Sequence, residues 1–349
     1  MIAACEEQGD FMCSKEMSKF GADLANRTRP ILYIIVPCYN EERVLPVTCS
    51  MFCTKLKEMI AKGKVSRFSK IMYVDDGGKD KTWAVISQLA SQNSCYIGIQ
   101  QSRNRGHQNA VLAGLMEAKD RCDIAISIDC DGQDDVEVME TMVDEYLRGA
   151  EVVYGVRNNR DSDSFFKRFT AESFYRLLQF MGVETIFNHA DYRLTSAKVL
   201  KALADYKEVN LFLRGMMPLV GFRSAIVHYK RHLRTEGESH YPFGKMVALA
   251  LNGITSFSVK PLHIVLLLGV VQCLVGIISI LVTIFEVGGS RTGGITVTQF
   301  ALGVGLLVLS GGIQLACLGI LGEYIGKMYL EVKHRPRYII SARTDDTVH

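Results

Sequence analysis

The sequence predicts an α/β domain with a mostly parallel, doubly wound sheet, followed by two membrane-spanning helices. Short apolar runs alternate four times with helical segments over residues 31–133, and such alternation is typical of a parallel sheet covered by helices. Carboxylates follow two of these runs directly. Two later stretches, 262–285 and 296–322, hold no charged residue, and each exceeds the ~20 residues that cross a bilayer.

Composition narrows the classes of protein. The chain has 349 residues and a formal net charge of +3, so its length suggests more than one unit and its charge gives no case for nucleic-acid binding. Its ten cysteines include no Cys-x-x-Cys pair, and we interpret them as reduced thiols of a cytosolic protein. Residues 1–29 lack the apolar run of a signal peptide, and we expect a mobile tail there.

The expected elements follow one another with short connections. Pro37 ends the first β-branched run, and a turn rich in glycine and acids follows the second. Because open α/β sheets bind ligands at the carboxyl ends of their strands, the segments after the strands predict the site. The strands are expected at 31–36, 71–74, 96–100, 124–128 and 151–154, and the helices at 44–61, 82–92, 110–119 and 136–147.

The strand at 124–128 leads into the most informative segment. Asp129 and Asp131 are alternate residues just past the strand, and Gln133 adds a further oxygen. Mg²⁺ binds such oxygen sets and shares them with substrate phosphates. The alternative is an acidic loop that caps the next helix. A second carboxylate pair, Asp75 and Asp76, ends the strand at 71–74, which favours the ligand site.

Three segments point towards a membrane surface. Residues 157–168 carry four cations beside phenylalanines; a solvated face is the usual explanation, and we expect a membrane-surface helix with an anion site. Residues 211–222 and 241–259 are apolar with few charges. Each forms either an interfacial helix or ordinary core packing, and we expect interfacial helices because each is too short or broken to span.

The apolar stretches set an expected topology. Seven lysines and arginines flank the two apolar stretches, whereas one arginine lies in the loop between these stretches. The positive-inside rule then places both flanks in the cytoplasm. Residues 1–260 would be cytosolic, and the segment around Pro336 would be extended, because proline restricts its neighbours.

Six motifs together resemble a known family. Taken with the two C-terminal spans, they are similar to family 2 glycosyltransferases of GT-A fold, and among these to polyprenyl-phosphate glycosyltransferases such as bactoprenol glucosyltransferases and, more distantly, dolichol-phosphate mannose synthases. The resemblance covers about residues 30–337. The motifs are V-P-C-Y-N-E-E (36–42), V-D-D-G-G-K-D (74–80), D-C-D-G-Q-D (129–134), F-K-R-F-T-A-E-S-F-Y-R-L (166–177), D-Y-R-L (191–194) and R-T-E-G-E-S-H-Y-P (234–242).

The resemblance implies roles for individual residues. The metal, Mg²⁺ or Mn²⁺, would be held on the donor diphosphate by Asp129, Asp131 and Gln133. Asp191 would lie beneath the sugar, as an orienter or a weak base. The nucleotide sugar would contact Pro37, Tyr39, Glu41, Gly106 and either Asp75 or Asp76, the acceptor phosphate would contact Arg157 and Arg168, and Arg234 would reach the diphosphate from a mobile loop.

The resemblance also implies domains and an activity. Residues 30–210 would form the catalytic domain, 211–260 the interfacial helices and substrate loop, 261–325 the two spans and 326–349 a cytoplasmic tail. The expected reaction is inverting transfer of a sugar, with UDP-glucose as the expected donor, to undecaprenyl phosphate for cell-envelope glycans. The partners would be the nucleotide sugar, polyprenyl phosphate, membrane lipid and further copies of the chain.

Other functions remain open at this point. Another donor of the GDP-mannose, UDP-GlcNAc or UDP-Ara4FN type would use the same motifs. A processive polysaccharide synthase would have a Gln-x-x-Arg-Trp motif, yet the single tryptophan is Trp83 in the donor half. A non-catalytic membrane scaffold would not need the full carboxylate set.

Overall fold

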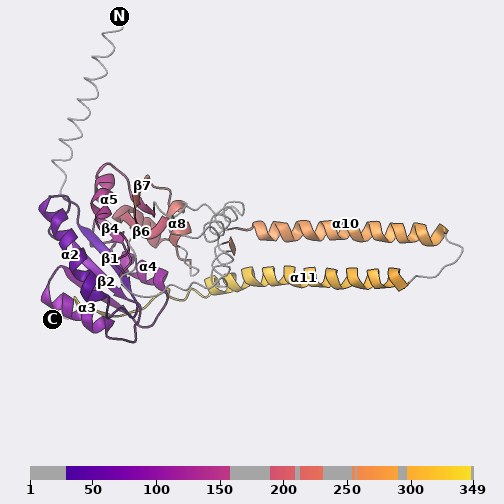
Figure 1. The fold of residues 1–349 in the computed structure, drawn as a ribbon, viewed down its shortest axis with the longest axis horizontal. Coiled ribbons are helices and arrows are strands. Elements are labelled where there is room, and N and C mark those ends of the chain that lie inside the picture. The colour runs from indigo at the N-terminus through magenta and orange to yellow at the C-terminus, as the bar shows by residue number, and fades with distance from the viewer. Residues whose placement is uncertain are drawn as a thin grey trace, which may run out of the picture.

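The computed structural model describes residues 29–157, 189–208, 213–230, 254–255, 258–289 and 297–346. One eight-stranded sheet has the strand order β7-β5-β6-β4-β1-β2-β3-β8, and two long helices extend away from it (Figure 1). The strands are β1 (Leu32–Cys38), β2 (Lys70–Asp75), β3 (Tyr96–Gln101), β4 (Ile124–Ser127), β5 (Val152–Arg157), β6 (His189–Ser196), β7 (Ser224–Tyr229) and β8 (Ile340–Arg343).

The sheet is mixed. Strands β4, β1, β2 and β3 are parallel neighbours, as predicted. Strand β6 runs antiparallel to both β4 and β5, and β8 runs antiparallel to β3. Strands β6, β7 and β8 were not predicted. In β6, Asp191 and Arg193 interrupt the apolar pattern that reveals a buried strand.

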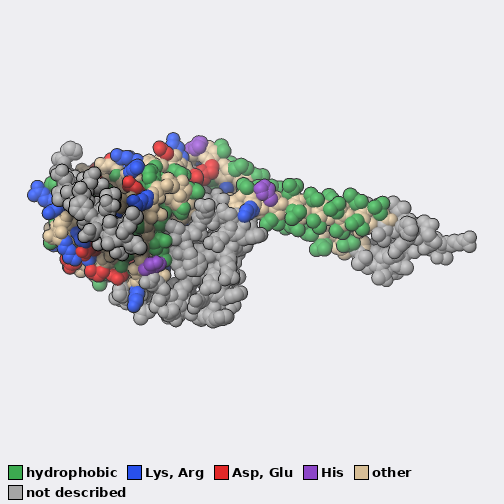
Figure 2. Space-filling view, turned by 90° about the horizontal axis from the view of Figure 1, so that it is seen from above, with side chains coloured by type: hydrophobic (Ala, Val, Ile, Leu, Met, Phe, Trp, Pro, Cys, Tyr) green, Lys and Arg blue, Asp and Glu red, His purple; other side chains and the backbone are tan. Residues whose placement is uncertain are grey.

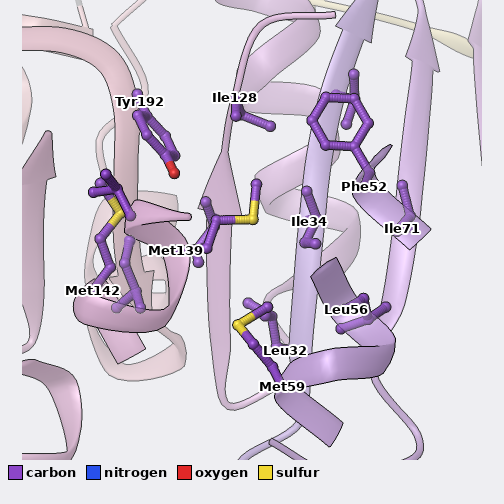
Figure 3. Packing of buried hydrophobic residues seen from close by; sticks show 14 of the residues in the cluster. Leu32, Ile34, Phe52, Leu56, Met59, Ile71, Ile128, Met139, Met142 and Tyr192 are labelled. Atoms are coloured by element: carbon purple, nitrogen blue, oxygen red, sulfur yellow. The ribbon is translucent and has the colours of Figure 1, made fainter. Parts of the chain in front are cut away.

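Helices cover both faces of the sheet. One face packs against α2 (Leu45–Ala61), α3 (Thr82–Gln92) and α5 (Val138–Leu147), and the other against α4 (His107–Ala118), α7 (Ala197–Ala204) and α8 (Leu213–Leu219). Strand β1 is buried along its whole length, since its alternate side chains enter the two cores. This explains its continuous apolar sequence. Figure 3 shows Leu32 and Ile34 of β1 in the first core, near Phe52 and Leu56 of α2.

Helix α8 corrects one expectation. Its Leu213, Met216 and Met217 are buried in the second core. The described part of the segment 211–222 is therefore a core helix, the alternative to an interfacial one. Almost all of the segment 241–259 lies outside the described residues.

The two apolar stretches form long helices, α10 (Lys260–Gly289) and α11 (Val297–Val332). Within the described residues, both are long and apolar enough to cross a membrane, and the most apolar part of each is exposed. They lie side by side (Figure 1), and apolar side chains predominate on the face of this extension that Figure 2 shows. Near the sheet domain, the Tyr324 hydroxyl donates to the carbonyl oxygen of Ser258 at 2.5 Å.

After α11 the chain returns to the sheet. Residues 335–339 are not helical, as Pro336 predicted, and β8 then pairs with β3 through Ile99–Arg343 and Gln100–Ala342. The Arg343 guanidinium donates to both carboxylate oxygens of Glu117 on α4, at 3.0 and 3.1 Å. The expected cytoplasmic tail is thus partly the edge strand of the sheet.

Candidate active site

The predicted strand-end carboxylates meet at one edge of the sheet. Because β1 is parallel to both β2 and β4, the carboxyl ends of these strands lie together. Asp75 is the last residue of β2, and Asp129 follows β4 by two residues. The edge therefore holds both acidic motifs, as the sequence predicted.

Asp75 is buried, and its two oxygens have separate partners. One accepts a hydrogen bond from the backbone N–H of Gly78 at 3.0 Å, and the other accepts one from the Gln100 amide at 3.0 Å. Burial raises the pKa of Asp75, although these hydrogen bonds oppose the shift. Its carboxylate therefore joins the turn after β2 to β3.

Asp76 anchors the start of α4. Its carboxylate accepts the backbone N–H groups of Arg105 at 2.8 Å and Gly106 at 2.9 Å, and its side chain is buried. The neighbouring Gly77 has φ +64°, and a Cβ there would lie 2.4 Å from the backbone of Arg103. Only glycine allows this approach. A contact from Asp75 or Asp76 to a base or ribose stays a prediction.

The other residues predicted for the nucleotide lie around the same edge. Pro37 is within β1, paired with Val74. Tyr39 follows β1 and is 43 % exposed. The backbone N–H of Glu41 donates to the Thr82 hydroxyl at 2.8 Å, which ties this loop to α3.

The residues predicted to hold a metal lie in one short segment that follows β4. About a third of the Asp129 side chain is exposed, and Asp131 accepts the backbone N–H of Gln133 at 3.1 Å. Among the described residues, no three His, Cys, Asp or Glu side chains converge as a metal site. Burial raises the pKa of Asp129, and the nearby carboxylates of Asp134 and Asp191 add to the shift.

This donor set fits a hard divalent cation. Mg²⁺ commonly takes one or two carboxylates and completes its shell with water and substrate phosphates. A bound cation would also relieve the repulsion among the carboxylates around Asp129. The Gln133 side chain is buried, and its part in such a site stays a prediction.

Asp191 lies on β6 and is bound by three cationic or polar side chains. Arg214 on α8 donates to both of its oxygens, at 3.1 and 3.2 Å, and Arg193 donates to one at 3.2 Å. His107 Nε2 lies 3.5 Å from Asp191 and 3.5 Å from Asp129. Burial favours a raised pKa, but His107 and the two arginines outweigh it and hold the pKa of Asp191 well below its usual range.

This arrangement contains two residues that sequence reasoning missed. His107 begins α4, directly after the glycine that Asp76 holds. Arg214 is the single charged residue of the otherwise apolar segment 211–222. A lone charge in such a segment is a signal for a buried or functional partner. Because its pKa is lowered, Asp191 is a weak proton acceptor and suits an orienting role better than that of a base.

Arg157, predicted for the acceptor phosphate, has partners within the domain. Its Nε donates to the Tyr229 hydroxyl at 3.1 Å, and its Nη2 lies 3.6 Å from Asp134. Tyr229 in turn donates to Asp134 at 2.7 Å. About a third of the Arg157 side chain is exposed, and its contact with a phosphate stays a prediction. Arg168 and Arg234 lie outside the described residues.

Comparisons with known proteins agree with the predicted family. The model of the Glycosyl transferase family 2 matches residues 33–204. The chain is 43 % identical over 314 residues to the uncharacterized glycosyltransferase YkoT of Bacillus subtilis, covering 90 % of this chain and 92 % of that protein. It is 36 % identical over 310 residues to the bactoprenol glucosyl transferase of Shigella phage SfV, covering 88 % and 97 %.

Among solved structures, the mannosyltransferase PcManGT of Pyrobaculum calidifontis is 16 % identical, with a TM-score of 0.43 over 66 % of this chain and 64 % of that one. The class of the protein follows from the sheet and the long sequence matches: it is a glycosyltransferase with a GT-A-like α/β domain. The chain belongs to glycosyltransferase family 2, so the resemblance seen in its motifs is confirmed.

Proposed function

We propose that this protein transfers glucose from UDP-glucose to undecaprenyl phosphate, with inversion at the anomeric carbon. The observation that carries the proposal is the sheet edge where His107 lies 3.5 Å from both Asp129 and Asp191. Two helices apolar enough for a membrane, in the same chain, support a lipid acceptor. The similar proteins named bactoprenol glucosyl transferase support both the sugar and the acceptor.

The proposed reaction does not require a strong general base. The attacking oxygen of a phosphate monoester is already anionic near neutral pH, so an ionised Asp191 held by arginines can orient groups without taking a proton. A divalent cation, held by Asp129 and Asp131, would neutralise charge on the leaving diphosphate. The main task of the protein is to bring two anionic phosphates together, which requires positive groups at this edge.

The proposal includes a location. The catalytic domain and both termini lie in the cytoplasm, where nucleotide sugars are made, and α10 and α11 cross the cytoplasmic membrane. The excess of lysine and arginine on the flanks of the helix pair supports this orientation. Assembly of several copies, expected from the family resemblance, belongs to the same proposal.

In the test, membranes that contain the protein are incubated with radiolabelled UDP-glucose, UDP-GlcNAc or GDP-mannose, and the lipids are then extracted. We expect label in the lipid fraction from UDP-glucose, and none with excess chelator or with the Asp129→Asn variant. Label from another donor would correct the sugar. Label in an insoluble polymer would favour a processive synthase, and no label from any donor would contradict transfer to lipid.

A further inference from the structure

We propose that a groove between α10 and α11 binds a second copy of this chain within the membrane, with the Gln314 amide at the contact. The inference rests on the membrane position of the two helices in the proposed function, and it names the surface through which the expected copies associate. This polar groove has a volume of about 620 Å³, and its lining includes Gly269 and Gln272 of α10 and Ser310 and Gln314 of α11.

The first support is the depth of the polar side chains. Gln272 lies near the middle of the uncharged stretch 262–285, and Ser310 lies near the middle of the stretch 296–322. The Gln272 amide donates to the Ser310 hydroxyl, so these two positions face each other across the helix pair. Gln314 follows Ser310 by about one helical turn, roughly 6 Å along the axis. All three side chains therefore lie inside a hydrocarbon core of about 30 Å.

The second support is the unused hydrogen-bonding capacity of the polar groove. An amide side chain has an NH₂ group that donates and an oxygen that accepts. Gln314 is exposed, and among the residues that the structure describes none hydrogen-bonds to its amide. Lipid tails cannot satisfy such a group, and leaving it unpaired in hydrocarbon costs free energy. Gln314 therefore needs a polar partner at its own depth in the membrane.

The third support is the match between the polar groove and a second copy of itself. Copies inserted in the same orientation place Gln314 at the same depth, and an amide both donates and accepts, so the two amides can pair. The tail of a lipid carries no such group. At Gly269 an added Cβ would meet no atom within 4 Å, so the groove leaves room for the close approach of a neighbouring helix. These observations favour a second copy over a lipid tail as the occupant.

The experiment measures association of full chains in phosphatidylcholine vesicles. Half of the chains carry a donor fluorophore on a C-terminal tag, half carry an acceptor, and energy transfer is followed as the protein is diluted into lipid. We expect wild-type chains to associate, and Gln314→Leu to weaken the association by about 3- to 10-fold, the usual effect of losing an interhelical hydrogen bond. Leucine favours membrane insertion, so this variant should stay in the bilayer.

The matched control is Ser279→Ala, because it removes a polar group of α10 that its own helix satisfies. The Ser279 hydroxyl donates to the carbonyl oxygen of Val275 at 2.8 Å. This variant should change the association by less than about twofold. Gln314→Asn keeps an amide and should recover part of the loss. A requirement for size alone would instead be met by leucine, which fills a similar volume.

Association of Gln314→Leu as strong as that of the wild type would overturn the inference, and so would wild-type chains that show no energy transfer at any dilution. Neither result affects the proposed sugar transfer, which is assayed separately on lipid extracts. Equal weakening by Gln314→Leu and Ser279→Ala would also count against the polar groove, because only the first of these residues lines it. Extraction of the wild-type protein by alkaline carbonate would remove the membrane position on which both proposals rest.

Discussion

Arg343 and Glu117 connect the C-terminal strand to helix α4, and reversing their charges tests that connection. The two contacts of 3.0 and 3.1 Å make a two-point ion pair across 226 residues of sequence. We expect Arg343→Glu to loosen β8 from β3, because it replaces attraction by repulsion. Glu117→Arg should do the same, and the double reversal should restore most of the docking.

The structure sets the size of the effect. At 3 to 4 Å and an effective dielectric constant near 20, two charges attract by roughly 4 kcal/mol before other costs. The Arg343 side chain is 34 % exposed and that of Glu117 is 21 % exposed, so solvent reduces this to a coupling of about 1–2 kcal/mol. Opening of the strand should therefore become roughly 5- to 30-fold more frequent in each single variant.

Hydrogen exchange followed by mass spectrometry measures this opening in the peptide that contains residues 338–346. The matched control is Lys198→Glu, because Lys198 is 67 % exposed and lies 4.0 Å from Glu151, so its reversal should change little. If the effects of Arg343→Glu and Glu117→Arg add within about 0.5 kcal/mol in the double variant, the pair does not couple and the reasoning fails.

Three further predictions concern the site, the topology and acid stability. Asp131→Asn should lower transfer by roughly a hundredfold or more while the protein stays folded, since it removes an expected cation ligand; transfer unaffected by excess chelator would contradict this role. A cysteine at Ser290 should react with an impermeant maleimide added to intact cells, whereas one at Ser341 should not, and the reverse pattern would refute the topology. The hydrogen bond from Lys62 lowers the pKa of Glu140 to about 2. The pKa of Glu140 is lower in the folded than in the unfolded protein, so the ionised carboxylate stabilises the fold above pH ~4.5. This stabilisation is lost as the pH falls towards 2, and it amounts to about 1 kcal/mol after allowance for screening by solvent. Denaturant unfolding of Glu140→Gln should lack that part of the pH dependence, and an unchanged profile would count against it.

The sequence predicts the elements whose patterns are uninterrupted. Strand β1 is apolar at nearly every position, and its neighbours β2 and β4 end at or shortly before carboxylates, so the parallel half of the sheet could be predicted. Strand β6 could not, because Asp191 and Arg193 are charged and yet buried: they pair with each other, and Asp191 also pairs with Arg214 of α8. Strand β8 has only four residues, and its partner β3 lies far away in sequence.

The residues of the site also differ in whether the sequence alone could predict them. Asp129 and Asp131 are visible in the sequence because they stand two positions apart just after a strand. His107 and Arg214 are single residues about a hundred positions apart, and only the packing of α8 against α4 brings them together. The buried state of Asp75 and Asp76 also depends on contacts with later segments. Local patterns therefore predict the ligands of a site better than the residues that position them.

Strand β8 has a consequence for the order of events during synthesis. The Thr344 hydroxyl accepts the N–H of Gly98, a contact that spans 246 residues. The ribosome makes both long apolar helices before this strand, so β3 keeps an open edge until α10 and α11 have been synthesised. A nascent chain stopped between Asp191 and Ile340 carries every carboxylate of this edge but not the strand that closes its sheet. The last step in building the sheet domain therefore waits for the two long helices.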